Sequence, residues 1–193
     1  MYNFIRVLIG LSTIVLLLLL NRKRGKGGKK ILFTIVIALV VWGGICMYFI
    51  PFENAFLTFG TPEEAYRYYG YNEDVKLIIE GRHSDLLVGD KNGTHIPLIV
   101  PKTDDGWKVG TAIDSKDVAF GSNNDAIVSI TQYKDTGEYY IAIYMVKDEV
   151  PQITDTLDTQ FVSYGRGYYA YIPEYNEKYH LLVNGKEIQW SEN

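Results

Sequence analysis

The sequence predicts an N-terminal transmembrane α-hairpin followed by a mainly β extracytoplasmic domain, an antiparallel meander or sandwich with one short helix. Two long apolar runs within residues 1–50 indicate the hairpin, and a cluster of cations between them indicates its orientation. Short apolar runs separated by turn residues across 54–193 indicate the β domain. The 193 residues are thus predicted to form a membrane part and one modest folded domain.

Charge changes sign at the same boundary. Residues 1–50 contain seven Lys and Arg and no Asp or Glu, whereas residues 51–193 contain 12 Lys and Arg against 23 Asp and Glu, a net charge of −11. Such a domain repels the phosphate backbone, so nucleic acid is excluded as a partner. Cys46 is the only cysteine, so packing rather than disulfides must hold the domain, and abundant aromatic residues exclude a wholly disordered chain.

Each apolar run is long enough to cross a bilayer. Residues 2–20 contain one charge, Arg6, and residues 31–50 contain none. At about 1.5 Å of rise per residue, each helix covers roughly 30 Å, the thickness of the hydrocarbon core. The alternatives are a buried helical pair in a soluble fold and a cleaved signal peptide at residues 1–20. Soluble core helices rarely run this long with so little charge, which disfavours the buried pair. The missing small-residue cleavage site disfavours the signal peptide.

The loop at 21–30 between the two runs sets the predicted orientation. It carries six positive charges, on Arg22, Lys23, Arg24, Lys26, Lys29 and Lys30. Basic loops stay in the cytoplasm, and at about 1 kcal/mol per cation near an anionic leaflet the preference reaches roughly 6 kcal/mol. The expected localisation is therefore the cell membrane, with two spans, the lipid bilayer as a partner and both termini outside the cytoplasm.

Three glycines predict where the two helices touch. Gly10 falls at about 12 Å depth from the outer surface, and Gly43 and Gly44 fall at about 9 to 10 Å. Small residues at matched depth let antiparallel helices approach closely, so we expect the helix contact there. Glycines tolerated in lipid-facing helices are the alternative.

A capping box predicts one short helix at the start of the outer domain. Thr61 is a helix N-cap residue, Pro62 suits the first helical position, and Glu64 completes the box. Gly70 is expected to end the helix after about two turns. Its bulky face should pack on the sheet that follows.

The rest of the domain has the pattern of short strands. Strands are expected at 75–80, 85–89, 94–100, 107–109, 126–133, 138–146, 160–164, 168–172, 179–183 and 187–190. Asn184-Gly185 is the strongest hairpin signal. Residues 111–125 and 148–159 are expected to be polar connections, and the first is expected to form a seam between two subdomains.

The C-terminal third carries a recognisable order of residues behind the apolar hairpin. The residues are Asp155, Phe161, Tyr169-Ala170-Tyr171, Tyr179 and Asn184-Gly185-Lys186-Glu187-Ile188. In this order the chain resembles uncharacterised two-span membrane-anchored proteins of low-GC Gram-positive bacteria. The resemblance implies a location at the membrane and no activity, so it assigns no site residue.

No pattern predicts a catalytic, metal-binding or cofactor-binding residue, and no cofactor is expected. His83, His95 and His180 lack metal-ligand spacing, although His83 and His95 could converge with Asp90 if their strands pair. Calcium loops at 90–93 and 123–125 are a weaker interpretation than ordinary turns. The sequence contains no nucleophile elbow.

Tyrosine is the distinctive residue, with 14 of the 16 beyond Pro51. Ordinary strand packing is the favoured interpretation, because tyrosine is a good strand former. Four tyrosines are kept as candidate interaction aromatics: Tyr139, Tyr168, Tyr169 and Tyr175.

Three functional classes fit these patterns. The first is a membrane-anchored binding, sensing or accessory protein of the cell envelope, with another envelope or membrane protein as partner. The second is a cell-surface hydrolase, which requires a deep pocket where two titratable groups converge. The third is an auxiliary subunit of a membrane transport complex, since two spans without a buried acid or base form no ion path alone.

Overall fold

The computed structural model of the protein describes residues 10, 12–15, 36–37, 40, 43, 51–71, 73–111, 114–134, 136–176 and 178–191. The described residues before Pro51 are helical. Within the described part of the chain, no helix has the length and apolar character needed to cross a membrane. The basic loop at 21–30 and most of both predicted spans lie outside the described residues, so the hairpin and its orientation stay predictions.

The glycines of the predicted helix contact are described only in part. A Cβ atom added at Gly10 or Gly43 would have no heavy atom within 4 Å. Gly44 lies outside the described residues. The contact between the two helices therefore also stays a prediction.

The predicted short helix is confirmed by its caps. Helix α3 (Pro62–Tyr69) begins after Thr61, whose side-chain oxygen accepts a hydrogen bond from the Glu64 backbone N–H at 3.3 Å. The Glu64 carboxylate accepts in turn from the Gly60 backbone N–H at 3.0 Å. In the usual capping box this donor is the backbone N–H of the N-cap residue, one position later. Gly70 ends the helix with φ of 119°, a left-handed conformation that suits glycine.

The first sheet confirms the predicted meander after the helix. Its strand order is β1-β2-β3-β4, with every neighbouring pair antiparallel. The strands are β1 (Val75–Glu80), β2 (Ser84–Lys91), β3 (Thr94–Thr103) and β4 (Gly106–Trp107). A short 3-10 helix, η1 (Phe52–Ala55), precedes this unit. On β3, strand β4 pairs with Lys102 and Thr103 alone, so the first half of β3 forms an edge of the sheet.

The second sheet has the strand order β13-β5-β6-β7-β10-β9 and is also antiparallel. Its strands are β5 (Ser115–Ser122), β6 (Ala126–Tyr133), β7 (Glu138–Met145), β9 (Val162–Tyr164), β10 (Gly167–Ile172) and β13 (Gln189–Trp190). Strand β5 corrects the expectation of a polar connection over 111–125. Its partner β13 is only two residues long, and a bulge between Asp117 and Ala119 breaks the apolar alternation that marks a strand in sequence.

A third, smaller sheet has the order β12-β11-β8. Its strands are β8 (Ile153–Asp155), β11 (Leu181–Val183) and β12 (Lys186–Glu187). Strand β8 lies in the segment 148–159 that was expected to be a connection; it is too short to give a periodic signal. The Asn184-Gly185 turn has φ of 54° and 73° and confirms the predicted hairpin, although β13, beyond it, joins the second sheet.

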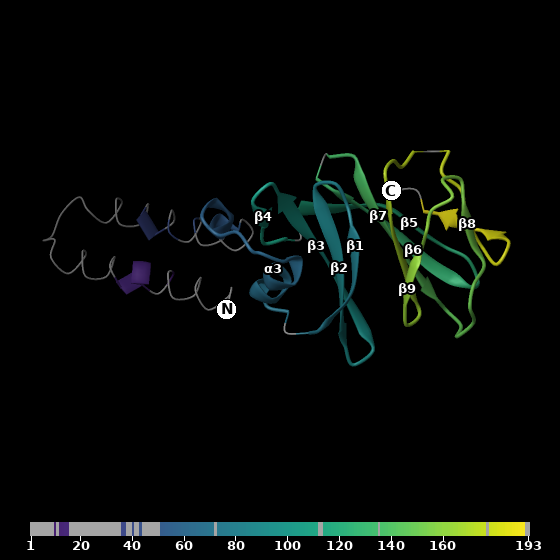
Figure 1. Ribbon diagram of the computed structural model, residues 1–193, viewed down its shortest axis with the longest axis horizontal. Helices are drawn as coiled ribbons and strands as arrows, with labels where there is room; N and C mark the ends of the chain where they lie inside the picture. The colour runs from purple at the N-terminus through teal and green to yellow at the C-terminus, as the bar shows by residue number, and fades with distance from the viewer. Residues whose placement is uncertain are drawn as a thin grey trace, which may run out of the picture.

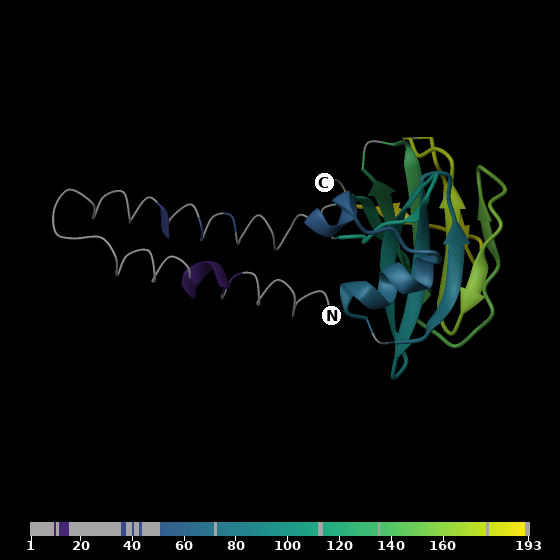
Figure 2. The same ribbon diagram turned by 60° about the vertical axis from the view of Figure 1, so that its left-hand side comes forward.

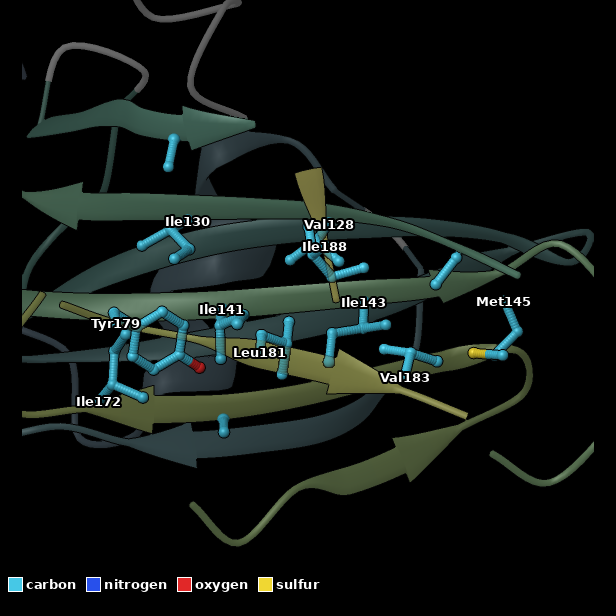
Figure 3. Packing of buried hydrophobic residues seen from close by; sticks show 13 residues of the cluster. Val128, Ile130, Ile141, Ile143, Met145, Ile172, Tyr179, Leu181, Val183 and Ile188 are labelled. Carbon is cyan, nitrogen blue, oxygen red and sulfur yellow. The ribbon is translucent and has the colours of Figure 1, made fainter. Parts of the chain in front are cut away.

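These elements stack in four layers, with α3 on the first sheet, the second sheet behind it, and the small sheet at the far end (Figures 1 and 2). Three groups of buried residues fill the spaces between successive layers. The largest lies between the second and third sheets, where Ile141, Ile143 and Leu181 are fully buried (Figure 3). The expectation of a mainly β, antiparallel domain is confirmed.

Candidate functional site: a cleft beside the first sheet

The second sheet presents a polar face to the first. Along β6, Val128 and Ile130 point into the core shared with the third sheet, so Ser129 and Thr131 between them point the other way. The pairing of β6 with β7 continues this face onto β7, because Ser129 is opposite Ala142 and Thr131 is opposite Tyr140. Hydroxyl and aromatic side chains therefore line the space facing β2 and β3.

A cleft of about 260 Å³ lies there, along the edge that the short β4 leaves on β3. Four tyrosines line it: Tyr69, Tyr71, Tyr140 and Tyr144. Four hydroxyl side chains line it as well: Thr111, Ser115, Ser129 and Thr131. Its apolar lining is Leu86, Pro97, Leu98, Ile99 and Ala142. The cleft thus combines ring faces with neutral hydrogen-bonding groups.

The cleft carries little charge. Among the described residues that line it, Asp117 is the one carboxylate and there is no Lys, Arg or His. The Asp117 carboxylate accepts a hydrogen bond from the Thr131 hydroxyl at 2.8 Å. Burial raises the pKa of Tyr71 and of Tyr140 above the ordinary value, so both phenols are neutral hydrogen-bonding groups near pH 7.

Two apolar side chains extend this face beyond the cleft. Phe120 is 51% exposed and lies opposite Ser129, a residue of the cleft wall. Ile127 is 43% exposed and lies on the same face, opposite Ser122. An exposed aromatic ring therefore stands directly beside the hydroxyl groups of the cleft.

Buried Glu138 fixes the position of the first sheet over the second. Glu138 is only 2% exposed, and its carboxylate accepts hydrogen bonds from the backbone N–H groups of Arg82 and His83 in the β1–β2 turn. The Tyr140 hydroxyl reinforces the contact by donating to the Ser84 backbone carbonyl at 2.7 Å. These bonds join residues about 55 positions apart and hold the two walls of the cleft together.

The three histidines lie apart from one another. His83 contacts the Glu138 carboxylate at 3.2 Å, and His180 contacts Glu187 at 2.6 Å. The His95 ring nitrogen Nδ1 lies 2.6 Å from the Tyr169 hydroxyl. No group of three or more metal-ligating side chains with metal-site geometry occurs among the described residues.

The proposed convergence of His83, His95 and Asp90 is wrong. Asp90 pairs with His95 at one end of the β2–β3 ladder, whereas His83 precedes Ser84, which pairs with Pro101 at the other end. The Asp90 carboxylate accepts from the Gly93 backbone N–H at 3.1 Å, so it serves the tight turn between these strands.

The four candidate interaction tyrosines lie elsewhere than the cleft. Tyr169 is fully buried between the first and second sheets. Tyr139, Tyr168 and Tyr175 are half-buried and pack against the core between the second and third sheets. The cleft tyrosines went unrecognised in the sequence, because only strand register places Tyr140 and Tyr144 on the face that carries the hydroxyl groups.

Comparisons of the chain with protein-family models, with curated proteins and with solved structures found no match. The geometry and chemistry of the cleft are therefore what point to a function. They describe a small, partly aromatic cavity whose described lining holds one carboxylate, Asp117, and no cation.

Proposed function

We propose that the protein is a membrane-anchored binding module of the cell envelope, whose β domain lies outside the cytoplasm and binds its ligand in the cleft beside β3. The observation that carries this proposal is the lining of the cleft, where tyrosine rings and hydroxyl groups meet in one cavity. The six cations of residues 21–30 support the outward placement, because a basic loop resists transfer across the bilayer.

Binding fits the cleft better than hydrolysis does. A hydrolase of the carboxylate type needs two acidic groups that converge on the scissile bond. The described lining supplies one, Asp117, which is already hydrogen-bonded to Thr131. The hydroxyl groups of Ser115 and Ser129 form no hydrogen bond to the described part of the chain, so they remain available to a bound molecule.

Reporter fusions test the location. An alkaline phosphatase joined after Asn193 should be active, because that enzyme matures only outside the cytoplasm, and a cytoplasmic reporter at the same position should be silent. The same pair inserted after Gly28, within the basic loop, should give the opposite result and serves as the matched control. A silent phosphatase together with an active cytoplasmic reporter after Asn193 would overturn the proposed placement.

A further inference from the structure

We propose that the cleft binds the end of an uncharged glycan chain, with a sugar ring inside the cavity and the next sugar on the exposed ring of Phe120. This inference rests on the proposed function, because it names the ligand class of the same cleft. A polar, ring-shaped ligand requires three things of a site: flat apolar surfaces, many neutral hydrogen-bonding groups, and a suitable volume.

The first requirement is met by the tyrosines. A pyranose ring has an apolar face formed by its C–H groups, and aromatic rings offer such a face a large, rigid contact surface. The rings of Tyr69 and Tyr71 lie 5.3 Å apart at the end of α3, and Tyr144 lines the cleft from β7. Ring surfaces thus reach the cavity from two layers of the structure.

The second requirement is met by the hydroxyl groups on β5 and β6. Sugar hydroxyls both donate and accept hydrogen bonds, as serine and threonine hydroxyls do. Ser115 and Ser129 have no hydrogen-bond partner within the described part of the chain, and the Asp117 carboxylate has acceptor capacity beyond its bond from Thr131.

The charge of the cleft lining and of the surrounding domain favours a neutral glycan over an anionic one. No cation lines the described cleft, and the surrounding domain carries a net charge of −11, with 12 basic against 23 acidic residues. An anionic sugar or a phosphate would lose its hydration without gaining an ion pair there. Uncharged sugars carry no such penalty.

Size and the position of Phe120 favour a chain over a free monosaccharide. The volume of about 260 Å³ lies slightly below the roughly 300 Å³ at which pockets for drug-sized ligands begin, so it suits a single ring. Phe120 stands opposite Ser129 and is 51% exposed, so it offers a second stacking surface just outside.

Calorimetric titration of the full chain in lipid nanodiscs tests the inference, since nanodiscs avoid competition from sugar-headed detergents. The probes are cellotetraose and tetra-N-acetylchitotetraose as neutral chains, glucose and N-acetylglucosamine as single sugars, and tetragalacturonate as an anionic chain. We expect saturable binding of at least one neutral chain, weaker binding of its monosaccharide, and no binding of tetragalacturonate.

Matched variants locate the binding. Phe120→Ala and Ser129→Ala should each weaken binding of the neutral chain by about tenfold. Phe56→Ala, at a phenylalanine 67% exposed elsewhere, and Ser163→Ala, at an exposed serine on β9, should leave it unchanged.

Three results would overturn the inference: no binding of either neutral chain, equal binding of tetragalacturonate or of the monosaccharide, or equal effects of the test and control variants. The reporter fusions are independent of these titrations. An active phosphatase after Asn193 combined with failed titrations would reject the glycan and leave the proposed location standing.

Discussion

Replacing the buried Glu138 with alanine should destabilise the β domain by about 3 kcal/mol, because two backbone N–H groups lose their charged acceptor in a partly buried contact between the sheets. Glu138 is 2% exposed, and its carboxylate accepts from the Arg82 and His83 backbone N–H groups. Glu138→Gln should cost less, since its carbonyl oxygen can still accept. Urea unfolding of the full chain, followed by tryptophan fluorescence, measures both changes.

Of the three tryptophans, Trp107 lies on β4 and reports on the first sheet. Its indole N–H donates to the Asp85 carboxylate at 2.6 Å, close to the β1–β2 turn that Glu138 holds. Glu149→Ala, at an exposed carboxylate, is the control and should leave the free energy of unfolding unchanged. If Glu138→Ala unfolded at the same urea concentration as the control, the carboxylate would not be the group that joins the two sheets.

Gly110→Ala should be at least as damaging, with an expected loss of about 3 kcal/mol or more. A Cβ atom at this buried position would lie 1.9 Å from the Ile99 backbone carbonyl oxygen, and a backbone atom in a strand cannot move aside as a flexible side chain can. Because Ile99 and Thr111 both line the cleft, the displacement should also deform the binding site.

Gly60→Ala is the matched control for this steric effect. A Cβ atom there would lie 3.6 Å from the end of the Glu64 side chain, an ordinary contact, and Gly60 is exposed. Thermal unfolding of the two variants beside the wild-type chain separates steric exclusion from the general effect of replacing glycine. Similar melting temperatures for Gly110→Ala and the wild-type chain would contradict the close packing of residue 110 against β3.

Features set by local chemistry were predictable from the sequence. The capping box at Thr61 and Glu64 forms its hydrogen bonds within a few residues, and the Asn184-Gly185 turn needs only two residues that accept positive φ. Strand β5 was not predicted, because its bulge and its polar residues interrupt the alternation of apolar and polar side chains by which a strand is recognised in sequence.

The cleft could not be predicted, because residues far apart in the sequence build it. Tyr71 follows α3, whereas Ser129 and Tyr144 lie on β6 and β7 of the second sheet, so their meeting depends on how α3 and the first sheet pack on the second. A one-residue change in the pairing of β6 would move Ser129 to the opposite face of its sheet. Sequence periodicity alone does not fix that register.

Cysteine labelling on intact cells tests the central claim most directly, namely that an open cleft is presented outside the cytoplasm. Cys46 is the only natural cysteine, so Cys46→Ser provides a background without thiols. Ser129→Cys places one thiol in the cleft, and Ser163→Cys places one on the exposed surface of β9. We expect a membrane-impermeant maleimide to label both thiols before cell lysis. Labelling of residue 163 without residue 129 would contradict an open cleft, and labelling of either only after lysis would contradict its outward presentation.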